Sequence, residues 1–303
     1  MIEIKNVSKS FGDVQVLDNI TCTIKSGAVF GIVGSNGAGK STLLRLISGV
    51  YDILSGSISF DGVKREDKVE SIPNLLFLSD EVYFESADTI DIVTKRYKNI
   101  YTDFDNEKFK KLLTVFKMKK TDRMMKLSKG MKKQVFLSIA LSCGIKYLLL
   151  DETLDGLDPL MRINIKKLIF DETARNNMTT IVTSHSLKEL EDICDGLAMI
   201  HDGEIVIQGD LEDIKNNLVK IRCAFNGEVS EETFKEFDMI GYEKSGKIIT
   251  IIVRGDEAEQ MERVNKLKPI LVETLPITVE EVFISRLRRL GYGSMEVMEE
   301  VLK

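Results

Sequence analysis

A glycine-rich segment near residue 34 carries the clearest chemical signal in the sequence. Residues 34–42 match the pattern G-x-x-x-x-G-K-[ST] in full, between an apolar run (Ala28 to Val33) and a helical pattern (Ser41 to Ser48). Glycines let successive backbone N–H groups point inward, and a helix N-terminus adds partial positive charge, so the segment predicts a cradle for nucleotide phosphates. Lys40 would reach the β- and γ-phosphates, and the Ser41 hydroxyl would bind Mg²⁺. The expected cradle residues are Gly34, Ser35, Asn36, Gly37, Ala38, Gly39, Lys40, Ser41 and Thr42.

Two acids follow a second apolar run, Tyr147 to Leu150. Asp151 is placed to hold Mg²⁺, directly or through water, as the acid at a strand end does in P-loop enzymes. Glu152 comes next and would polarise an attacking water as a general base. Acids after a strand are also common as a solvated turn, and the phosphate cradle in the same chain is what favours the catalytic interpretation.

Further segments occur in a recognisable order. Leu127-Ser128-Lys129-Gly130-Met131 resembles the L-S-G-G-Q signature of ATP-binding cassette (ABC) ATPases, and His185 in Thr183-Ser184-His185 resembles their switch histidine. Leu154 to Pro159, which includes Asp158, resembles their D-loop, and Phe11 lies where they place an adenine-stacking ring. Over residues 1 to about 213 the chain therefore resembles the ATP-binding subunit of a bacterial ABC transporter.

The resemblance implies a mechanism and partners. Two subunits, expected to be identical, would pack head to tail with ATP and Mg²⁺ between one subunit's cradle and the other's Ser128 and Gly130. Glu152 and His185 would be the catalytic residues, and a separate transmembrane permease would be the driven partner, which places the chain in the cytoplasm at the inner face of the membrane. Three simpler roles stay open: a structural histidine for His185, a core aromatic for Phe11 and a helix N-cap for Ser128.

The sequence departs from the family pattern at the joint between sheet and helices. Phe77 to Asp80 aligns with Y-L-P-Q, so Asp80 stands where the family has a coupling glutamine. An ionised carboxylate adds negative charge and cannot donate a hydrogen bond. We expect Asp80 to couple the nucleotide site to the partner protein, and Glu81 is the alternative residue for this role. The simplest interpretation of Asp80 is an aspartate at the start of a surface loop.

The signature also departs from the pattern, because Lys129 replaces its first glycine and Met131 its glutamine. Ser128 and Gly130 remain, so the γ-phosphate contacts can survive. The simplest interpretation of Lys129, Lys132 and Lys133 is a solvated start of a helix.

The alternation of apolar runs and helical patterns predicts an α/β fold. We expect a P-loop core with a mostly parallel sheet and an antiparallel flank over residues 1–213, an inserted helical lobe at about 80–142, and a small α+β appendage over 214–303. The predicted strands are Ile2 to Val7, Val14 to Ile24, Ala28 to Val33, Tyr147 to Leu150, Thr179 to Val182, Val219 to Phe225 and Lys247 to Val253. The predicted helices are Ser41 to Ser48, Asp88 to Tyr97, Asn106 to Phe116, Met131 to Ser142, Leu187 to Cys194, Glu231 to Phe237, Glu257 to Leu267 and Val279 to Leu290.

Composition narrows the function classes. A net charge of -6 argues against nucleic acid as the main partner, and the four dispersed cysteines indicate buried, reduced thiols. A P-loop kinase or GTPase is disfavoured by Ser128, Gly130 and His185 and by the lack of an N-K-x-D motif. A soluble ABC ATPase acting on the ribosome remains the alternative, although such proteins usually carry two cassettes. Export is favoured because the appendage, with Val279 to Phe283, resembles the extension of ABC-2-type and drug- or lantibiotic-export ATPases.

Overall fold

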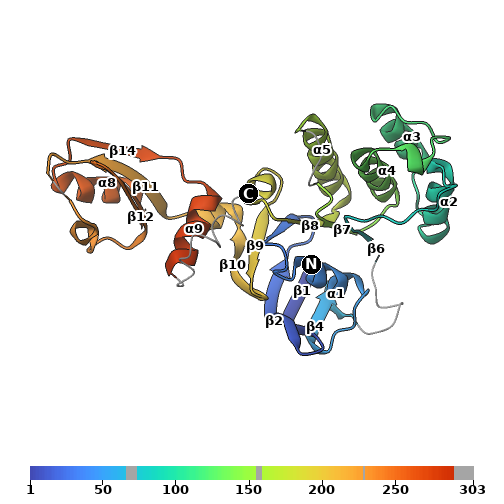
Figure 1. Cartoon of the computed structure of the whole chain (residues 1–303), viewed down its shortest axis with the longest axis horizontal. Helices are drawn as coiled ribbons and strands as arrows, with labels where there is room; N and C mark the ends of the chain where they lie inside the picture. Colours follow the sequence, from blue (N-terminus) through green and yellow to red (C-terminus); the bar gives the residue numbers. More distant parts are fainter. Residues whose placement is uncertain (66–73, 155–158, 228, 290–303) are drawn as a thin grey trace. The chain divides into compact units, whose positions relative to one another are not determined.

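The chain separates into two compact units, Met1–Gln208 and Gly209–Lys303 (Figure 1). The structure is a computed structural model, and it describes residues 1–65, 74–154, 159–227 and 229–289. Within these ranges no helix is long and apolar enough to cross a membrane.

The N-terminal unit is built on two sheets, one antiparallel with the order β2-β1-β4-β5 and one of six strands with the order β10-β9-β3-β8-β7-β6. In the second sheet the neighbouring pairs of β9, β3, β8, β7 and β6 are parallel. Its central strands β3, β7 and β8 are fully buried, and β3 and β7 are near-continuous apolar runs, as expected of strands covered on both faces. The predicted α/β core with a mostly parallel sheet and an antiparallel flank is confirmed. The strands are β1 (Ile2–Phe11), β2 (Val14–Ile24), β3 (Val29–Val33), β4 (Ser55–Phe60), β5 (Val63–Lys64), β6 (Leu75–Leu78), β7 (Tyr147–Asp151), β8 (Thr179–Ser184), β9 (Gly196–His201) and β10 (Glu204–Asp210).

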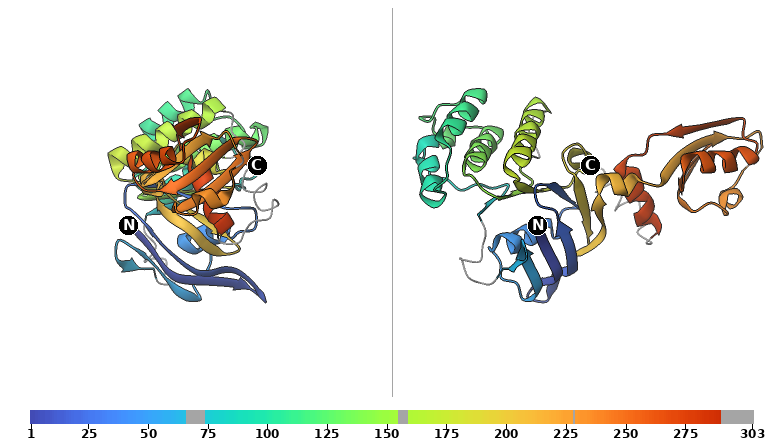
Figure 2. Two further views of the ribbon diagram at one scale, coloured as in Figure 1. Left: turned by 90° about the vertical axis from the view of Figure 1, so that its left-hand side faces the viewer. Right: turned by 180° about the vertical axis from the view of Figure 1, so that it is seen from behind.

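Helices α2, α3 and α4 lie together between β6 and β7 in the chain (Figures 1 and 2). The side chains of Thr89, Asp105 and Ser128 accept hydrogen bonds from the first-turn N–H groups of these three helices, which explains where each helix begins. Helix α6 is shorter than predicted, since it ends at Glu191 instead of Cys194. The helices of this unit are α1 (Lys40–Ser48), α2 (Ile90–Ile100), α3 (Asn106–Val115), α4 (Lys129–Ser142), α5 (Pro159–Asn176) and α6 (Leu187–Glu191).

The C-terminal unit is a four-stranded antiparallel sheet with the order β12-β13-β11-β14. Its core is formed by one face of the sheet, where Ile221 and Ile251 are fully buried together with Phe234. The predicted helix Glu231 to Phe237 is wrong: a 3-10 turn covers only Glu231–Phe234, and a strand follows from Met239. The remaining elements are α7 (Leu211–Lys215), β11 (Leu218–Ala224), β12 (Met239–Ser245), β13 (Ile248–Arg254), α8 (Glu257–Lys266), β14 (Leu271–Leu275) and α9 (Val279–Arg289).

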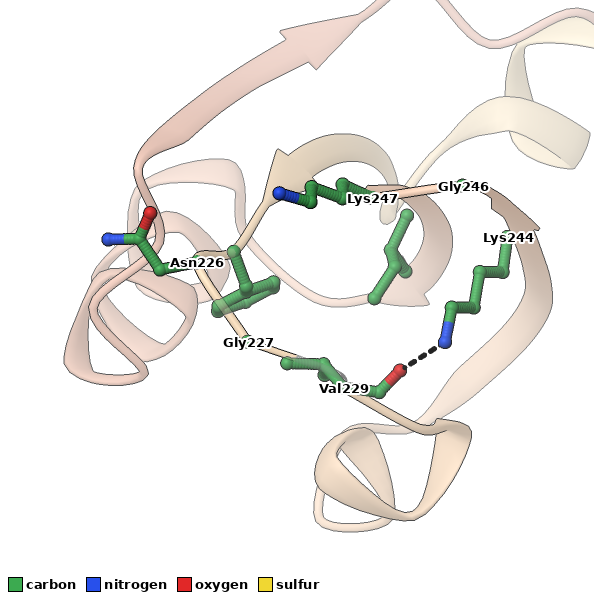
Figure 3. A pocket seen from close by; sticks show the side chains of 8 residues that line it. Asn226, Gly227, Val229, Lys244, Gly246 and Lys247 are labelled. Atoms are coloured by element: carbon green, nitrogen blue, oxygen red, sulfur yellow. Dashed lines mark hydrogen bonds between the residues drawn. The ribbon is translucent and has the colours of Figure 1, made fainter.

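A cavity of about 290 Å³ opens beside the β12–β13 hairpin of this unit (Figure 3). The Lys244 ammonium closes one side by donating a hydrogen bond of 2.9 Å to the Val229 carbonyl. Its wall is otherwise main chain and a few side chains, with Asn226 and Lys247 exposed at the rim. Among the residues that the structure describes, those lining the cavity include no acid.

Candidate active site

The glycine-rich loop leaves β3 and enters α1 without a side-chain cap. Gly37 and Gly39 take φ values of 86° and 105°, a region that disfavours other residues. A Cβ on Gly39 would lie 2.5 Å from the Leu17 side chain, so glycine is required there for space as well. The first N–H groups of α1 therefore remain available to an anion, as the phosphate cradle requires.

Lys40 lies at the floor of this loop and is only 4% exposed. Its ammonium donates hydrogen bonds of 2.7 and 3.0 Å to the carbonyls of Gly34 and Ser35. It also forms an ion pair of 3.4 Å with the Glu152 carboxylate. The loop cation and the proposed general base thus lie close enough to contact the same phosphoryl group.

The carboxylate of Asp151 is held by two hydroxyls. Ser41 donates to its Oδ1 at 2.9 Å, and Thr183 donates to the same atom at 2.8 Å. Mg²⁺ prefers oxygen ligands and is usually bound by one or two carboxylates plus substrate phosphates. The pairing of a Ser41 hydroxyl with an Asp151 carboxylate fits this preference, and no cluster of three or more His, Cys, Asp or Glu in the described residues offers a denser cage.

Thr183 is a residue that sequence reasoning did not single out. It is fully buried, and besides contacting Asp151 its hydroxyl accepts the Glu152 N–H at 3.1 Å. The strand pairing places Thr183 opposite Asp151. Its position just before Ser184 and His185 was visible in the sequence, but the register that brings it to both acids was not.

Strand order brings these groups together. The cradle follows β3, His185 follows β8, Asp151 ends β7, and Asp80 lies two residues after β6. These four strands are parallel neighbours, so their carboxyl ends meet at one edge of the sheet. Ligands of open α/β sheets bind at this edge.

Phe11 is not a core aromatic, because it is 45% exposed at the end of β1. Its ring packs edge-on against Tyr51 with 5.3 Å between centroids. The Lys9 ammonium lies 5.4 Å from the Phe11 ring and 5.6 Å from the Tyr51 ring. The pair offers an exposed aromatic surface suited to a nucleotide base.

Ser128 caps helix α4, since its hydroxyl accepts the Met131 N–H at 3.2 Å. Gly130 lies in the first turn of the same helix. Both residues therefore lie at a helix N-terminus that can meet an anion. Asp158 lies outside the described residues, and His185 is partly buried directly after β8.

Asp80 is bound by two lysines of α4. Lys129 and Lys133 each approach a different carboxylate oxygen at 2.8 Å. Burial opposes ionisation of Asp80, but the hydrogen bonds from the two lysines outweigh it and hold the pKa of this carboxyl below its usual value. An aspartate ordinarily titrates near pH 4, so the carboxylate is ionised throughout the physiological range.

The expectation of three solvated lysines is wrong for Lys133. Lys129 is exposed, but Lys133 is only 4% exposed, and its ammonium also donates to the Glu152 carbonyl at 2.9 Å. Lys132 lies over the Phe84 ring at 4.7 Å. A charge run at a helix start is usually solvated, but α4 here packs against the segment that follows β6.

A glycine-rich loop between β3 and α1 at the edge of a mostly parallel sheet defines a P-loop nucleotide-binding fold. Residues 17–155 match the ABC transporter family. The chain is 31% identical to the ABC transporter ATP-binding protein YtrB of Bacillus subtilis, over 94% of this chain and 98% of that protein. It therefore belongs to the ATP-binding proteins of the ABC transporter family, for which ATP hydrolysis is implied.

Other relatives carry names for the transport of different substrates. The lantibiotic transport ATP-binding protein SrtF of Streptococcus pyogenes is 29% identical over 72% of this chain and 97% of its own length. The methionine import ATP-binding protein MetN of Bacillus subtilis is 26% identical over 97% of this chain and 91% of its own length. Among solved structures, an ATP-binding subunit of an ABC transporter superposes with a TM-score of 0.64 at 24% identity, covering 71% of this chain and 92% of that one, which supports the fold.

Proposed function

We propose that this chain hydrolyses MgATP at the edge formed by β3, β8, β7 and β6, and that hydrolysis powers export by a separate membrane permease. The observation that carries the proposal is the meeting of five groups there. The cradle and Lys40 would bind the phosphates, Ser41 and Asp151 would hold the metal, and Glu152 would activate water.

The chemistry follows from these contacts. Backbone N–H groups at the start of α1 and the Lys40 ammonium would stabilise charge that develops on the γ-phosphate oxygens. Ser41 and Asp151 would hold Mg²⁺, which would neutralise phosphate charge. Glu152 would take the proton from the attacking water, and His185, next to it in the strand order, would hydrogen-bond the γ-phosphate and orient the water. Phe11 would stack on the adenine.

Each site is proposed to be completed by a second copy of the chain. Ser128 and Gly130 at the N-terminus of α4 would contact the γ-phosphate held by the partner's cradle, with Asp158 at the same interface. A solved bacterial ABC transporter cassette described as dimeric has the same fold, with a TM-score of 0.63 at 22% identity over 70% of this chain and 99% of that one. We propose residues 1–213 as the ATPase domain, with the helical lobe at about 80–142, and 214–303 as an extension.

The proposed working place is the cytoplasmic side of the membrane, bound to the permease. Export is proposed because the C-terminal extension resembles that of export ATPases and because SrtF, a lantibiotic transport protein by name, is among the relatives. MetN shows that import proteins are also related, so direction needs its own test.

Lys40→Ala tests the site. We expect ATPase turnover of the purified chain to fall to background and nucleotide binding to weaken, because the phosphates lose their cation. Lys64→Ala, an exposed lysine on β5, is the matched control and should leave turnover unchanged. Wild-type turnover in Lys40→Ala would refute the assignment of the cradle.

Native partners test the transport role. Affinity capture of the tagged chain from detergent-solubilised membranes of its own host should bring down a multi-span membrane protein. Ribosomal subunits in its place would support the ribosome-acting alternative. Direction follows from cells that carry Lys40→Ala: loss of an exporter raises sensitivity to toxic compounds such as peptide antibiotics, whereas a growth requirement for a nutrient would contradict export.

A further inference from the structure

The main chain of Glu152 is held in an unfavourable conformation. Its φ is 48°, in the left-handed region, which is strained for a residue with a Cβ. Such a conformation persists only where the surroundings impose it. Its N–H donates to the buried Thr183 hydroxyl at 3.1 Å, and its carbonyl accepts from the Lys133 ammonium at 2.9 Å. Two side chains from different elements thus fix both ends of the residue.

The Lys133 ammonium carries its charge in a buried place, which is costly unless the charge is paired. Asp80 supplies the pairing carboxylate at 2.8 Å. A neutral glutamine at position 80 would not balance this charge. The replacement of the family's glutamine by Asp80 and the burial of Lys133 therefore explain each other.

We propose that Lys133 is a positioning residue for Glu152, that it is held in place by Asp80, and that this pair couples the segment after β6 to the hydrolytic site. The inference rests on the proposed function, because it assigns to Glu152 the role of general base. Asp80 then acts through Lys133 and α4, and not as a ligand of Mg²⁺.

The segment after β6 has the contacts needed to move together with α4. Asp80 is bound to Lys129 as well as Lys133, and Phe84 packs under Lys132. A permease that displaces this segment would pull on the helix that carries both Lys133 and the signature residues Ser128 and Gly130. The same displacement would thereby shift Glu152 in its own subunit and the residues that contact the γ-phosphate bound by the partner.

Lys133→Met is the test, since methionine keeps the length and apolar stem of lysine and removes the ammonium. We expect kcat for ATP hydrolysis to fall on the order of 10–100-fold, the loss typical of a reacting group misplaced by about 1 Å, while KM for ATP stays within about twofold. Lys133→Arg should restore part of kcat. Lys126→Met, an exposed lysine without an ion pair in the described part of the chain, is the control and should behave as wild type.

The link to Asp80 is tested in the same assay. Asp80→Asn alone should lower kcat. In the Lys133→Met background it should lower kcat little further, because both substitutions break the same Asp80–Lys133 ion pair. A full further loss in the double variant would show that Asp80 acts independently of Lys133 and would overturn the proposal. Unchanged kcat in Lys133→Met would do the same.

A crystal structure of Lys133→Met tests the positioning role of Lys133 without an activity measurement. We expect the Glu152 φ to leave the left-handed region once its carbonyl loses the ammonium. An unchanged Glu152 main chain would overturn the positioning role. If the wild-type chain shows no ATPase activity, the proposed function fails, and the crystal structure still tells whether Lys133 sets the Glu152 conformation.

Discussion

Thr183→Val probes the hydrogen bonds that join the two acids. Valine has nearly the shape of threonine, and both favour strands, so the substitution removes one hydroxyl and little else. That hydroxyl donates to Asp151 at 2.8 Å and accepts the Glu152 N–H at 3.1 Å in a fully buried place. The variant therefore leaves a buried N–H without its partner and takes one donor from a carboxylate.

The expected cost follows from these two contacts. An unsatisfied buried donor costs about 1–3 kcal/mol, and a hydrogen bond to a charged group is worth a similar amount. The added apolar group offsets part of this, so we expect the free energy of unfolding of the N-terminal unit to drop by about 2 kcal/mol. For a unit of this size that corresponds to a Tm lower by roughly 4–8 °C. Turnover should fall as well, because the Glu152 main chain loses one of its two tethers.

Thr180→Val is a matched control on the same strand. Thr180 is also fully buried, but its hydroxyl has no hydrogen-bond partner in the part of the chain that the structure describes. Removing an unsatisfied hydroxyl relieves a penalty, so this variant should be as stable as wild type or more stable. Differential scanning calorimetry measures the Tm of both variants. Equal Tm values for Thr183→Val and Thr180→Val would refute the reasoning.

Two further predictions concern reactive groups. Glu152→Gln should retain ATP binding while turnover drops at least about 100-fold, because an amide cannot take the proton from water. A radiolabelled-ATP binding assay measures the first effect and a phosphate-release assay the second. Normal turnover would contradict the general-base role. Burial raises the pKa of Cys22 to about 12 and of Cys223 to about 11, and only the thiolate is nucleophilic. Iodoacetamide at pH 8 should therefore label these thiols far more slowly in the folded chain than in urea, as followed by mass spectrometry; equal rates would contradict their burial.

The sequence was sufficient to predict the elements whose residues act locally. A glycine-rich turn between an apolar strand and a helix was predicted from its pattern, and the structure has this turn, with positive φ at Gly37 and Gly39 and no side-chain cap on α1. The buried parallel strands β3 and β7 are likewise readable as short apolar runs. Strand β9 was missed although it is fully buried. The strands β4, β5, β6, β10, β12 and β14 were also missed, because segments that are only partly buried carry no strong pattern. The helix predicted at Glu231 failed for a related reason: polar residues that suit a helix start there form a 3-10 turn before a strand.

What the sequence did not predict are the contacts between motifs. Lys133 stands in a run of lysines, and every local rule places such a run in solvent. Its burial depends on how far α4 approaches the end of β6, and that distance is set by packing between elements separated along the chain. Thr183 was equally hidden, since its role comes from its register against Asp151. Both residues contact the backbone of Glu152. The motifs identify the residues proposed to touch substrate. Lys133 and Thr183 hold the main chain of Glu152, and a contact to the main chain does not depend on the residue type there, so it leaves no pattern in the sequence.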